Sequence, residues 1–397
     1  MWAMWSGFEF FEGFSLLYGP PGAGKTSLAL YAAFKLGERV LYVGFYETGE
    51  KVVSKARALG LDVGRLTVLD FLTVSDADVL FSTLVSKYVE VKPDVTILDG
   101  INALPQSREA AASIYRIFMG PVIAIGEESV GGSHFAYYAD SLVEVRQVFH
   151  RGARYRLLRV VKTRLSPSRG AEYFFTISRR GVHLLRKWSQ GVVGGKLAAA
   201  PSGRRVAFSE EVVKALVGRA PAYTRPGLLA GSRVGAFLED HPTPLRLAAA
   251  FLCDYLDEAK VGVVSTYPLM GSLARQVGCS VEEVVVPAAV LDDDAALHEA
   301  LDKVGDASVV ALYGLEEVLV RYGARRVGYI MDFFQTFLPD SAVLAAFKGV
   351  KPTRELLGMF NTVWKFYPDR AVVVKSALGW PVRELRVVER EGRFNLE

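Results

Sequence analysis

The chain has few cysteines and no long apolar run, the features that mark disulfide-rich, metal-binding and membrane proteins. Its 397 residues include two cysteines, Cys253 and Cys279, and these form neither a close metal-binding pair nor a disulfide framework. A reducing, cytoplasmic compartment is therefore expected. No apolar run approaches the length of a membrane span, so no membrane role is expected. The apolar start, Met1–Trp5, lacks a basic region and is interpreted as a lead-in to a core strand rather than a signal peptide.

Side-chain amides are also scarce, which is a habit of hyperthermophile proteins. The few present are Asn102, Asn361, Asn395, Gln106, Gln147, Gln190, Gln276 and Gln335. A thermophilic source is one interpretation, and GC-biased codon usage is the other. The net charge of +4 is too small to identify a partner. Its distribution is more informative, because residues 146–187 contain twelve Lys or Arg and a single acid, Glu172.

The first half alternates short β-rich runs with helical stretches, which predicts a mostly parallel sheet flanked by helices. After Ser141 the helices stop, and four strand-like runs predict an antiparallel extension at the sheet edge. The strands expected before that point cover 15–18, 39–45, 66–69, 95–98 and 122–125, and the helices cover 26–36, 50–59, 77–89 and 109–118.

Alternation resumes after a small, flexible segment, 189–203, which is the expected linker. The predicted domains are therefore 1–188 and 204–397. Strands are expected in the second domain at 234–238, 261–264, 284–286, 309–313, 327–331 and 371–375. The order of strands, helices and loops repeats that of the first half, so the second domain is interpreted as a diverged α/β repeat of the first.

The strongest motif is a glycine-rich loop between the first strand and the first helix. It has the form GxxxxGK[ST], in the strand–loop–helix context that this phosphate-binding motif requires. Glycines let backbone N–H groups turn toward phosphate oxygens. Lys25 then supplies charge to the β- and γ-phosphates, and Thr26 a hydroxyl to Mg²⁺. The predicted nucleotide-binding residues are Gly19, Pro20, Pro21, Gly22, Ala23, Gly24, Lys25, Thr26 and Ser27.

A second motif is the apolar strand Val95–Asp99, which ends in a carboxylate about seventy residues after Lys25. A carboxylate at the carboxyl end of a strand beside a P-loop can hold the Mg²⁺ shell. Thr26 and Asp99 are therefore the predicted metal residues, and ATP with Mg²⁺ the predicted ligands.

From about Phe8 to Leu185, the chain resembles the KaiC-like branch of the RecA-superfamily ATPases. The resemblance rests on the P-loop, on VLYVGFYETGEKVVSKARALGLDV after it, on TILDGINAL, and on the late segments ADSLVEV, VVKTR and YFFTISRRGVHLL. It implies a RecA-like core and ATP hydrolysis. In this branch an acidic pair follows the second strand and one member activates water. Here the pair reads Tyr46-Glu47, which leaves Glu47 as the candidate base and Glu127 or Glu128 as alternatives.

The resemblance also assigns a role to Lys162-Thr163-Arg164, which matches the K-x-R motif of ring-forming relatives. In those relatives the two cations reach the γ-phosphate of the adjacent subunit. Lys162 and Arg164 are thus expected to be catalytic, with a homo-oligomer or an intrachain pseudo-dimer as the assembly. The alternative for both is solvated charge on an edge strand.

The wider basic stretch includes Arg151, Arg154, Arg156, Arg159 and Arg169 and allows binding to single-stranded DNA. No RNA-binding signature or zinc finger accompanies it. His134 and the two tyrosines that follow it are expected to pack.

The second half has lost the features that bind nucleotide. EDHPTPLRLA stands at the P-loop position without a loop glycine, and Tyr313 stands in place of Asp99. Lys375 keeps the place of Lys162, but Ala377 replaces Arg164. The sequence therefore predicts one Mg-ATP site per chain and hydrolysis coupled to assembly, signalling or regulation. A non-hydrolysing nucleotide-gated scaffold and a recombinase-like DNA-binding ATPase are the alternatives.

Overall fold

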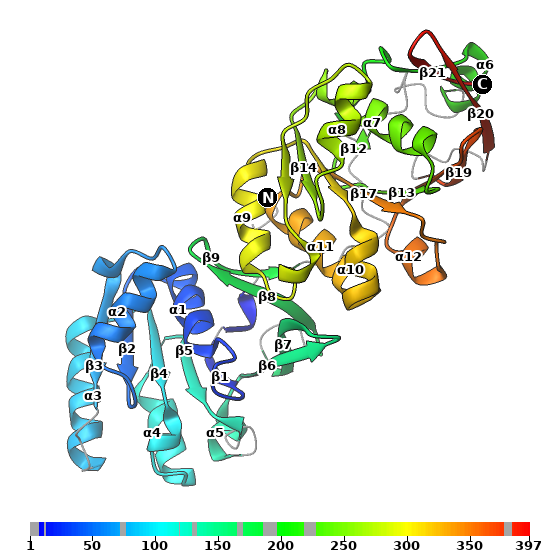
Figure 1. Cartoon of the computed structure of the whole chain (residues 1–397). Helices are drawn as coiled ribbons and strands as arrows, with labels where there is room; N and C mark the ends of the chain where they lie inside the picture. Colours follow the sequence, from blue (N-terminus) through cyan, green and yellow to red (C-terminus); the bar gives the residue numbers. More distant parts are fainter. Residues whose placement is uncertain are drawn as a thin grey trace. The chain divides into compact units, whose positions relative to one another are not determined.

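The computed structural model divides into two compact units (Figure 1). Unit 1 comprises Met1–Phe149 and Arg154–Leu185, and unit 2 comprises His150–Ala153 and Arg186–Glu397. The residues that the structure describes are 8–11, 13–71, 77–118, 120–128, 133–164, 170–185, 197–217, 228–376 and 383–397. The expected lead-in strand at Met1–Trp5, Arg169, Ala377 and residues 189–196 of the expected linker lie outside them.

Unit 1 is built on one nine-stranded sheet of order β3-β2-β4-β5-β1-β6-β7-β8-β9. The first six strands of this order pair in parallel. They include β6, the first of the four strands expected after Ser141, so the expected antiparallel extension is confirmed for β7, β8 and β9. The strands are β1 (Phe14–Tyr18), β2 (Val40–Gly44), β3 (Leu66–Asp70), β4 (Val95–Asp99), β5 (Val122–Gly126), β6 (Ser141–His150), β7 (Ala153–Thr163), β8 (Glu172–Ser178) and β9 (Gly181–Leu185).

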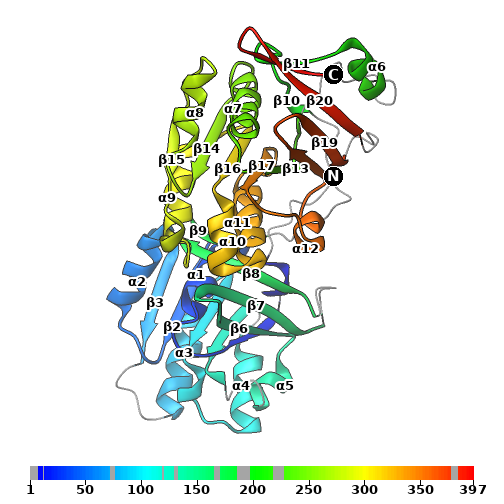
Figure 2. The same ribbon diagram turned by 45° about the vertical axis from the view of Figure 1, so that its right-hand side comes forward.

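Helices cover both faces of this sheet because each face is apolar. One core cluster joins α1 and α2 to the sheet, and a second joins α3, α4 and α5 to the opposite face (Figure 2). The helices are α1 (Lys25–Leu36), α2 (Gly49–Ala58), α3 (Ala77–Val91), α4 (Arg108–Ile117) and α5 (His134–Tyr138). Short 3₁₀ turns occupy Glu9–Phe11, Val63–Arg65 and Ile101–Ala103. The carboxyl ends of the parallel strands β1, β2, β4 and β5 thus lie together along one end of the sheet, which we call its carboxyl edge. Ligands bind at this end in open α/β sheets.

Unit 2 repeats this topology. Its ten-stranded sheet has the order β15-β14-β16-β17-β13-β18-β19-β20-β21-β11, which matches unit 1 strand for strand except for the added β11. The strands are β11 (Val206–Phe208), β13 (Arg233–Leu238), β14 (Val261–Ser265), β15 (Glu283–Val285), β16 (Val309–Tyr313), β17 (Ala342–Lys348), β18 (Thr362–Phe366), β19 (Arg370–Lys375), β20 (Arg383–Arg390) and β21 (Arg393–Leu396). The repeat expected from the sequence is therefore present in the fold.

The helices of unit 2 are distributed as in unit 1, with α7 and α8 packed on one face of the sheet. They are α6 (Glu210–Val217), α7 (Pro242–Leu256), α8 (Met270–Gln276), α9 (Ala295–Val304), α10 (Leu315–Tyr322), α11 (Ala324–Phe337) and α12 (Arg354–Gly358), with a 3₁₀ turn at Ala288–Val290. A separate two-stranded sheet pairs β10 (Leu197–Ala199) with β12 (Leu228–Leu229), so part of the expected linker is a strand. None of the helices in the described part of the chain is long and apolar enough to cross a bilayer.

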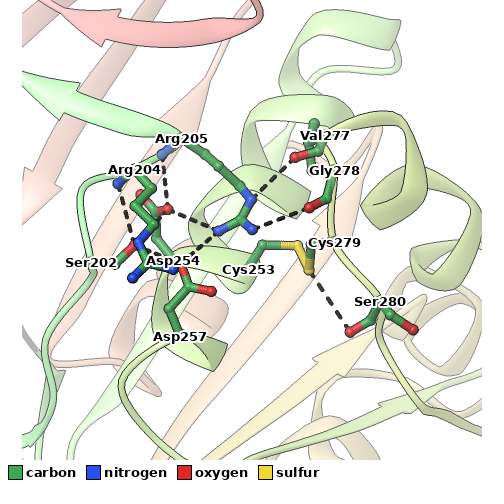
Figure 3. Close-up of a disulfide and its surroundings, with 10 residues drawn as sticks. All are labelled: Ser202, Arg204, Arg205, Cys253, Asp254, Asp257, Val277, Gly278, Cys279 and Ser280. Atoms are coloured by element: carbon green, nitrogen blue, oxygen red, sulfur yellow. Dashed lines mark hydrogen bonds and ion pairs between the residues drawn. A yellow bond between two sulfur atoms is a disulfide. The ribbon is translucent and has the colours of Figure 1, made fainter.

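Two expectations for unit 2 are wrong. Residues 327–331, predicted to be a strand, lie inside helix α11, and the fifth strand of the repeat is instead β17. The two cysteines form a disulfide that joins α7 to the loop after α8 (Figure 3). Beside it, Arg205 donates to the carbonyls of Val277 and Gly278 and pairs with Asp257 at 2.7 Å.

Candidate nucleotide site

The loop from Gly19 to Gly24 joins β1 to α1 at the carboxyl edge of the sheet. Its three glycines have positive φ angles of 148°, 75° and 98° at Gly19, Gly22 and Gly24, a region that glycine enters at no steric cost. A Cβ on Gly19 would lie 1.9 Å from the carbonyl oxygen of Val145, and one on Gly24 would lie 2.7 Å from Cδ1 of Ile177. The backbone contact excludes a side chain at Gly19. At Gly24 and Gly22 the positive φ angles are what favour glycine, since Ile177 could move and a Cβ on Gly22 would meet no atom within 4 Å.

Helix α1 begins directly after this loop. Its N-cap is Gly24, which carries no side chain to cap the first turn, so the first N–H groups of α1 can bind an anion together with the helix dipole. The Lys25 ammonium donates to the carbonyls of Gly19 and Pro20 at 2.7 and 2.8 Å. Burial lowers the pKa of Lys25, while Asp99, Glu127 and Glu128 oppose the shift. A lysine held in this way over a loop of N–H groups is suited to phosphate.

Asp99, the last residue of β4, faces the first turn of α1. Its Oδ2 accepts hydrogen bonds from the Thr26 hydroxyl at 2.7 Å and from the Tyr42 phenol at 2.6 Å. Burial raises the pKa of Asp99, and both hydrogen bonds counteract that rise. Thr26 and Asp99 thus present the hard oxygen donors that Mg²⁺ prefers. Among the described residues there is no cluster of three or more His, Cys, Asp or Glu that would form an all-protein metal cage.

Glu47 lies in the loop between β2 and α2, on the same edge. The Lys55 ammonium contacts both of its carboxylate oxygens, at 2.6 and 2.5 Å. Both Glu47 and Lys55 also act on the pKa of Asp99, which places this ion pair within electrostatic range of the predicted metal residues. Tyr46, at the position of the lost acid, is 59% exposed and lies against Gly100, where a Cβ would come within 2.6 Å of its ring.

Glu127 and Glu128 follow β5 and are exposed. The backbone N–H of Glu127 donates to Oδ1 of Asn102 at 2.8 Å, which ties the end of β5 to the turn after Asp99. Their effect on Lys25 shows that these two acids belong to the same cluster of charges. The structure therefore brings Lys25, Thr26, Asp99, Glu47 and both alternative acids to one edge.

Lys162 and Arg164 lie at the opposite end of the sheet, where β1 begins. The N–H of Arg164 donates to the carbonyl of Asp140 at 2.9 Å, and the N–H of Asp140 donates to the carbonyl of Phe14, the first residue of β1, at 2.7 Å. The side chains of Lys162 and Arg164 both donate to the carbonyl of Tyr137 in α5, at 3.2 and 3.3 Å. The P-loop follows the last residue of β1, so these cations are separated from it by the length of the strand.

Two cations of the basic stretch are paired with acids in the described residues. Arg146 pairs with Glu144, and Arg159 with Glu172 at 3.7 Å. Arg156, counted above only as one cation of this stretch, lies beside the P-loop, where its Cδ would be 3.7 Å from a Cβ on Gly24. The sequence gave no sign that Arg156 lies near Gly24, because β7 follows the P-loop by more than a hundred residues.

The equivalent edge of unit 2 is built differently. Only three residues, Glu239–His241, separate β13 from α7. The His241 side chain caps α7 by accepting the N–H of Thr243 at 3.3 Å, and Pro242 and Pro244 contribute no N–H groups. Tyr313, which ends β16 as Asp99 ends β4, is buried in the core beneath α7. This edge presents neither the loop nor the carboxylate of unit 1.

Residues 15–119, from β1 to just past α4, match the family model of the ATPase family associated with various cellular activities (AAA). This match supports a P-loop ATPase core in unit 1. The match covers both the P-loop and Asp99, the two features whose geometry is described above, and it implies binding of ATP. No curated protein matches the chain.

Proposed function

We propose that the chain hydrolyses ATP at one Mg²⁺-dependent site in the P-loop ATPase domain, and that its relatives are the KaiC-like ATPases. The observation that carries the proposal is the glycine loop, Lys25 and the Thr26–Asp99 pair gathered at one sheet edge. Catalysis of phosphoryl transfer needs mainly positioning and charge neutralisation, and these groups supply both. Thr26 and Asp99 would hold Mg²⁺, which neutralises charge on the phosphate oxygens when bound.

Glu47 is the proposed general base, and Lys55 orients it. Glu47 is half-buried on the same edge as Asp99, and both of its oxygens are fixed by one ammonium group. The same ion pair favours a second candidate function. Because Lys55 engages both oxygens of Glu47, the domain could act as a nucleotide-gated switch with little turnover. Binding of single-stranded DNA stays a prediction from the sequence.

Unit 2 is proposed to bind no nucleotide and to serve in assembly, signalling or regulation. Its support is the capped, proline-containing start of α7 and the buried Tyr313. Successive N–H groups cannot surround an oxyanion in a three-residue connection without glycine.

Phosphate release and calorimetry on the full chain test these proposals together. Wild-type protein should release phosphate from ATP and bind about one non-hydrolysable analogue per chain. Lys25→Ala should abolish both, whereas Lys35→Ala in the last turn of the same helix should abolish neither. Binding with negligible turnover would favour the switch. Two bound nucleotides per chain, or wild-type turnover in Lys25→Ala, would refute the assigned site.

A further inference from the structure

Tyr42 is a buried residue of the central sheet that no motif singled out. It lies in the middle of β2, is 0% exposed, and pairs in register with Ile97 of β4. Its ring extends along the strand over Gly44, where a Cβ would be only 3.0 Å from Cε1 of Tyr42. The phenol thereby reaches the Asp99 carboxylate at the carboxyl edge.

Tyr42 and Thr26 donate hydrogen bonds to the same carboxylate oxygen of Asp99. The Tyr42 phenol donates to Oδ2 of Asp99 at 2.6 Å, and this is the same oxygen that accepts the Thr26 hydroxyl at 2.7 Å. A phenol carries its proton near neutral pH and a carboxylate only accepts, so Tyr42 is the donor in this bond. Two donors from α1 and β2 thus fix the orientation of one carboxylate.

Unit 2 provides an internal comparison for this contact. Gly44 pairs with Asp99 between β2 and β4, and Ser265 pairs with Tyr313 between β14 and β16, so the register aligns the two strand pairs. Two residues before Ser265, at the position of Tyr42, stands Val263. The tyrosine, the glycine below its ring and the carboxylate are therefore replaced together in the unit without a P-loop, although the sheet is the same.

This joint replacement argues against a purely structural role for Tyr42. A buried phenol requires a hydrogen-bond partner, and an apolar side chain fills the same strand position in unit 2 without one. What distinguishes unit 1 is the site at its edge. Mg²⁺ demands near-ideal octahedral geometry, so the orientation of an acidic group in its shell matters, and outer partners of such groups tune metal affinity.

We infer that Tyr42 is a positioning residue for magnesium: it holds the Asp99 carboxylate toward Thr26 and so sets how strongly Mg²⁺ enhances nucleotide binding. This inference rests on the proposed Mg²⁺-dependent function. It concerns binding and makes no use of Tyr42 in the chemical step.

The test is calorimetric binding of a non-hydrolysable ATP analogue to full-length protein, with Mg²⁺ and with EDTA. The ratio of the two affinities is the Mg²⁺ enhancement. Tyr42→Phe keeps the ring and removes only the donor, so it should reduce this enhancement by about 10- to 100-fold. The affinity in EDTA should change by less than about 3-fold, since the variant leaves the P-loop intact.

Two further variants isolate the cause. Tyr329→Phe is the matched control, because the buried Tyr329 phenol of unit 2 donates to Asp294 at 2.7 Å in the same type of bond. It should leave the Mg²⁺ enhancement unchanged. In an Asp99→Asn background, Tyr42→Phe should have no additional effect, because its action passes through that carboxylate.

The outcomes distinguish a failure of the Tyr42 inference from a failure of the proposed Mg²⁺-dependent function. A wild-type protein with no Mg²⁺ enhancement would refute the proposed function, and the role of Tyr42 with it. A normal wild-type enhancement that persists in Tyr42→Phe, or that falls equally in Tyr329→Phe, would refute the positioning role alone. An additional loss in the Asp99→Asn background would also overturn it.

Discussion

Two carboxylates at the carboxyl edge of unit 1 have different partners, and the difference agrees with the roles proposed for them. Asp99 accepts from two neutral hydroxyl donors, whereas Glu47 is held by the Lys55 ammonium. Asp99 is thus paired with no cation of its own among these contacts. Asp99 is therefore the proposed metal residue, and Glu47 the proposed general base.

The role of Glu47 gives the first residue-scale prediction. Glu47→Gln should lower kcat by about 10²- to 10⁴-fold, the range for loss of a general base, while Mg-ATP binding stays within a few-fold. Single-turnover hydrolysis and analogue binding measure the two effects. Glu127→Gln is the matched comparison, since it removes an alternative acid that lies near Lys25. A large loss in Glu127→Gln with normal turnover in Glu47→Gln would exchange the two assignments.

His183 in β9 gives the second residue-scale prediction, which concerns the pH dependence of stability. Its Nε2 lies 2.9 Å from the carbonyl of Arg180, its ring contacts Tyr31 at 5.9 Å, and burial lowers its pKa below 6.5. The unfolded chain therefore takes up the proton at higher pH than the folded chain. The stability that this group supports is complete above about pH 6.5 and is lost as the pH falls toward the folded-state pKa.

Urea unfolding of unit 1 at pH 7.5 and pH 5.5 measures this effect. The wild-type midpoint should fall at the lower pH, and His183→Gln should flatten the dependence. The same change at His150, an exposed histidine at the end of β6, should not flatten it. Equal pH dependence in wild type and His183→Gln would contradict the assignment.

At the scale of elements, apolar periodicity predicted most strands and helices of both sheets, and the failures have physical causes. Residues 327–331 read as a strand because Val327, Tyr329 and Ile330 are β-formers. They lie in α11, a helix with apolar side chains buried on much of its surface, where propensity yields to packing. The loop motifs were predictable because the P-loop is contiguous, whereas Tyr42 and Arg156 reach the site only through strand order, which local sequence does not encode.

The disulfide between α7 and the loop after α8 was also unpredictable from two isolated cysteines 26 residues apart. A crosslink closing a loop of this length stabilises a fold by about 3–4 kcal/mol in the chain-entropy account. The double variant Cys253→Ala/Cys279→Ala should lower the free energy of unfolding of unit 2 by that order. Reductant should lower the wild-type value similarly and leave the double variant unchanged. Equal stability of the reduced and oxidised wild type would show that the crosslink contributes nothing.

At the scale of the whole molecule, the two sheets share one strand order but only one has a phosphate loop. Sequence comparison within the chain was sufficient to see this, because both the repeat and its losses are visible along the strands. Lys162 and Arg164 lie at the edge of the ATPase domain opposite the P-loop, so they cannot reach the nucleotide bound by the same domain.

If these cations contribute to hydrolysis, they must therefore act on a nucleotide held by another copy of the chain. Head-to-tail contact between identical subunits joins one edge of each domain to the opposite edge of the next. An arginine supplied in this way can accelerate phosphoryl transfer by about 10³- to 10⁵-fold. Turnover per chain should consequently rise with protein concentration, and Arg164→Ala should lose most of it while still binding Mg-ATP.

Mixing two inactive variants tests the trans arrangement directly. Lys25→Ala chains keep Arg164 but have no working P-loop, and Arg164→Ala chains have the reverse. In an equal mixture, half of the chains have an intact P-loop and half of their neighbours supply Arg164, so about a quarter of the wild-type rate should return. Doubling the amount of either variant alone should restore nothing. Concentration-independent turnover by a monomer, or no recovery in a mixture that co-assembles by light scattering, would leave Lys162 and Arg164 as edge charges held by the carbonyls of α5.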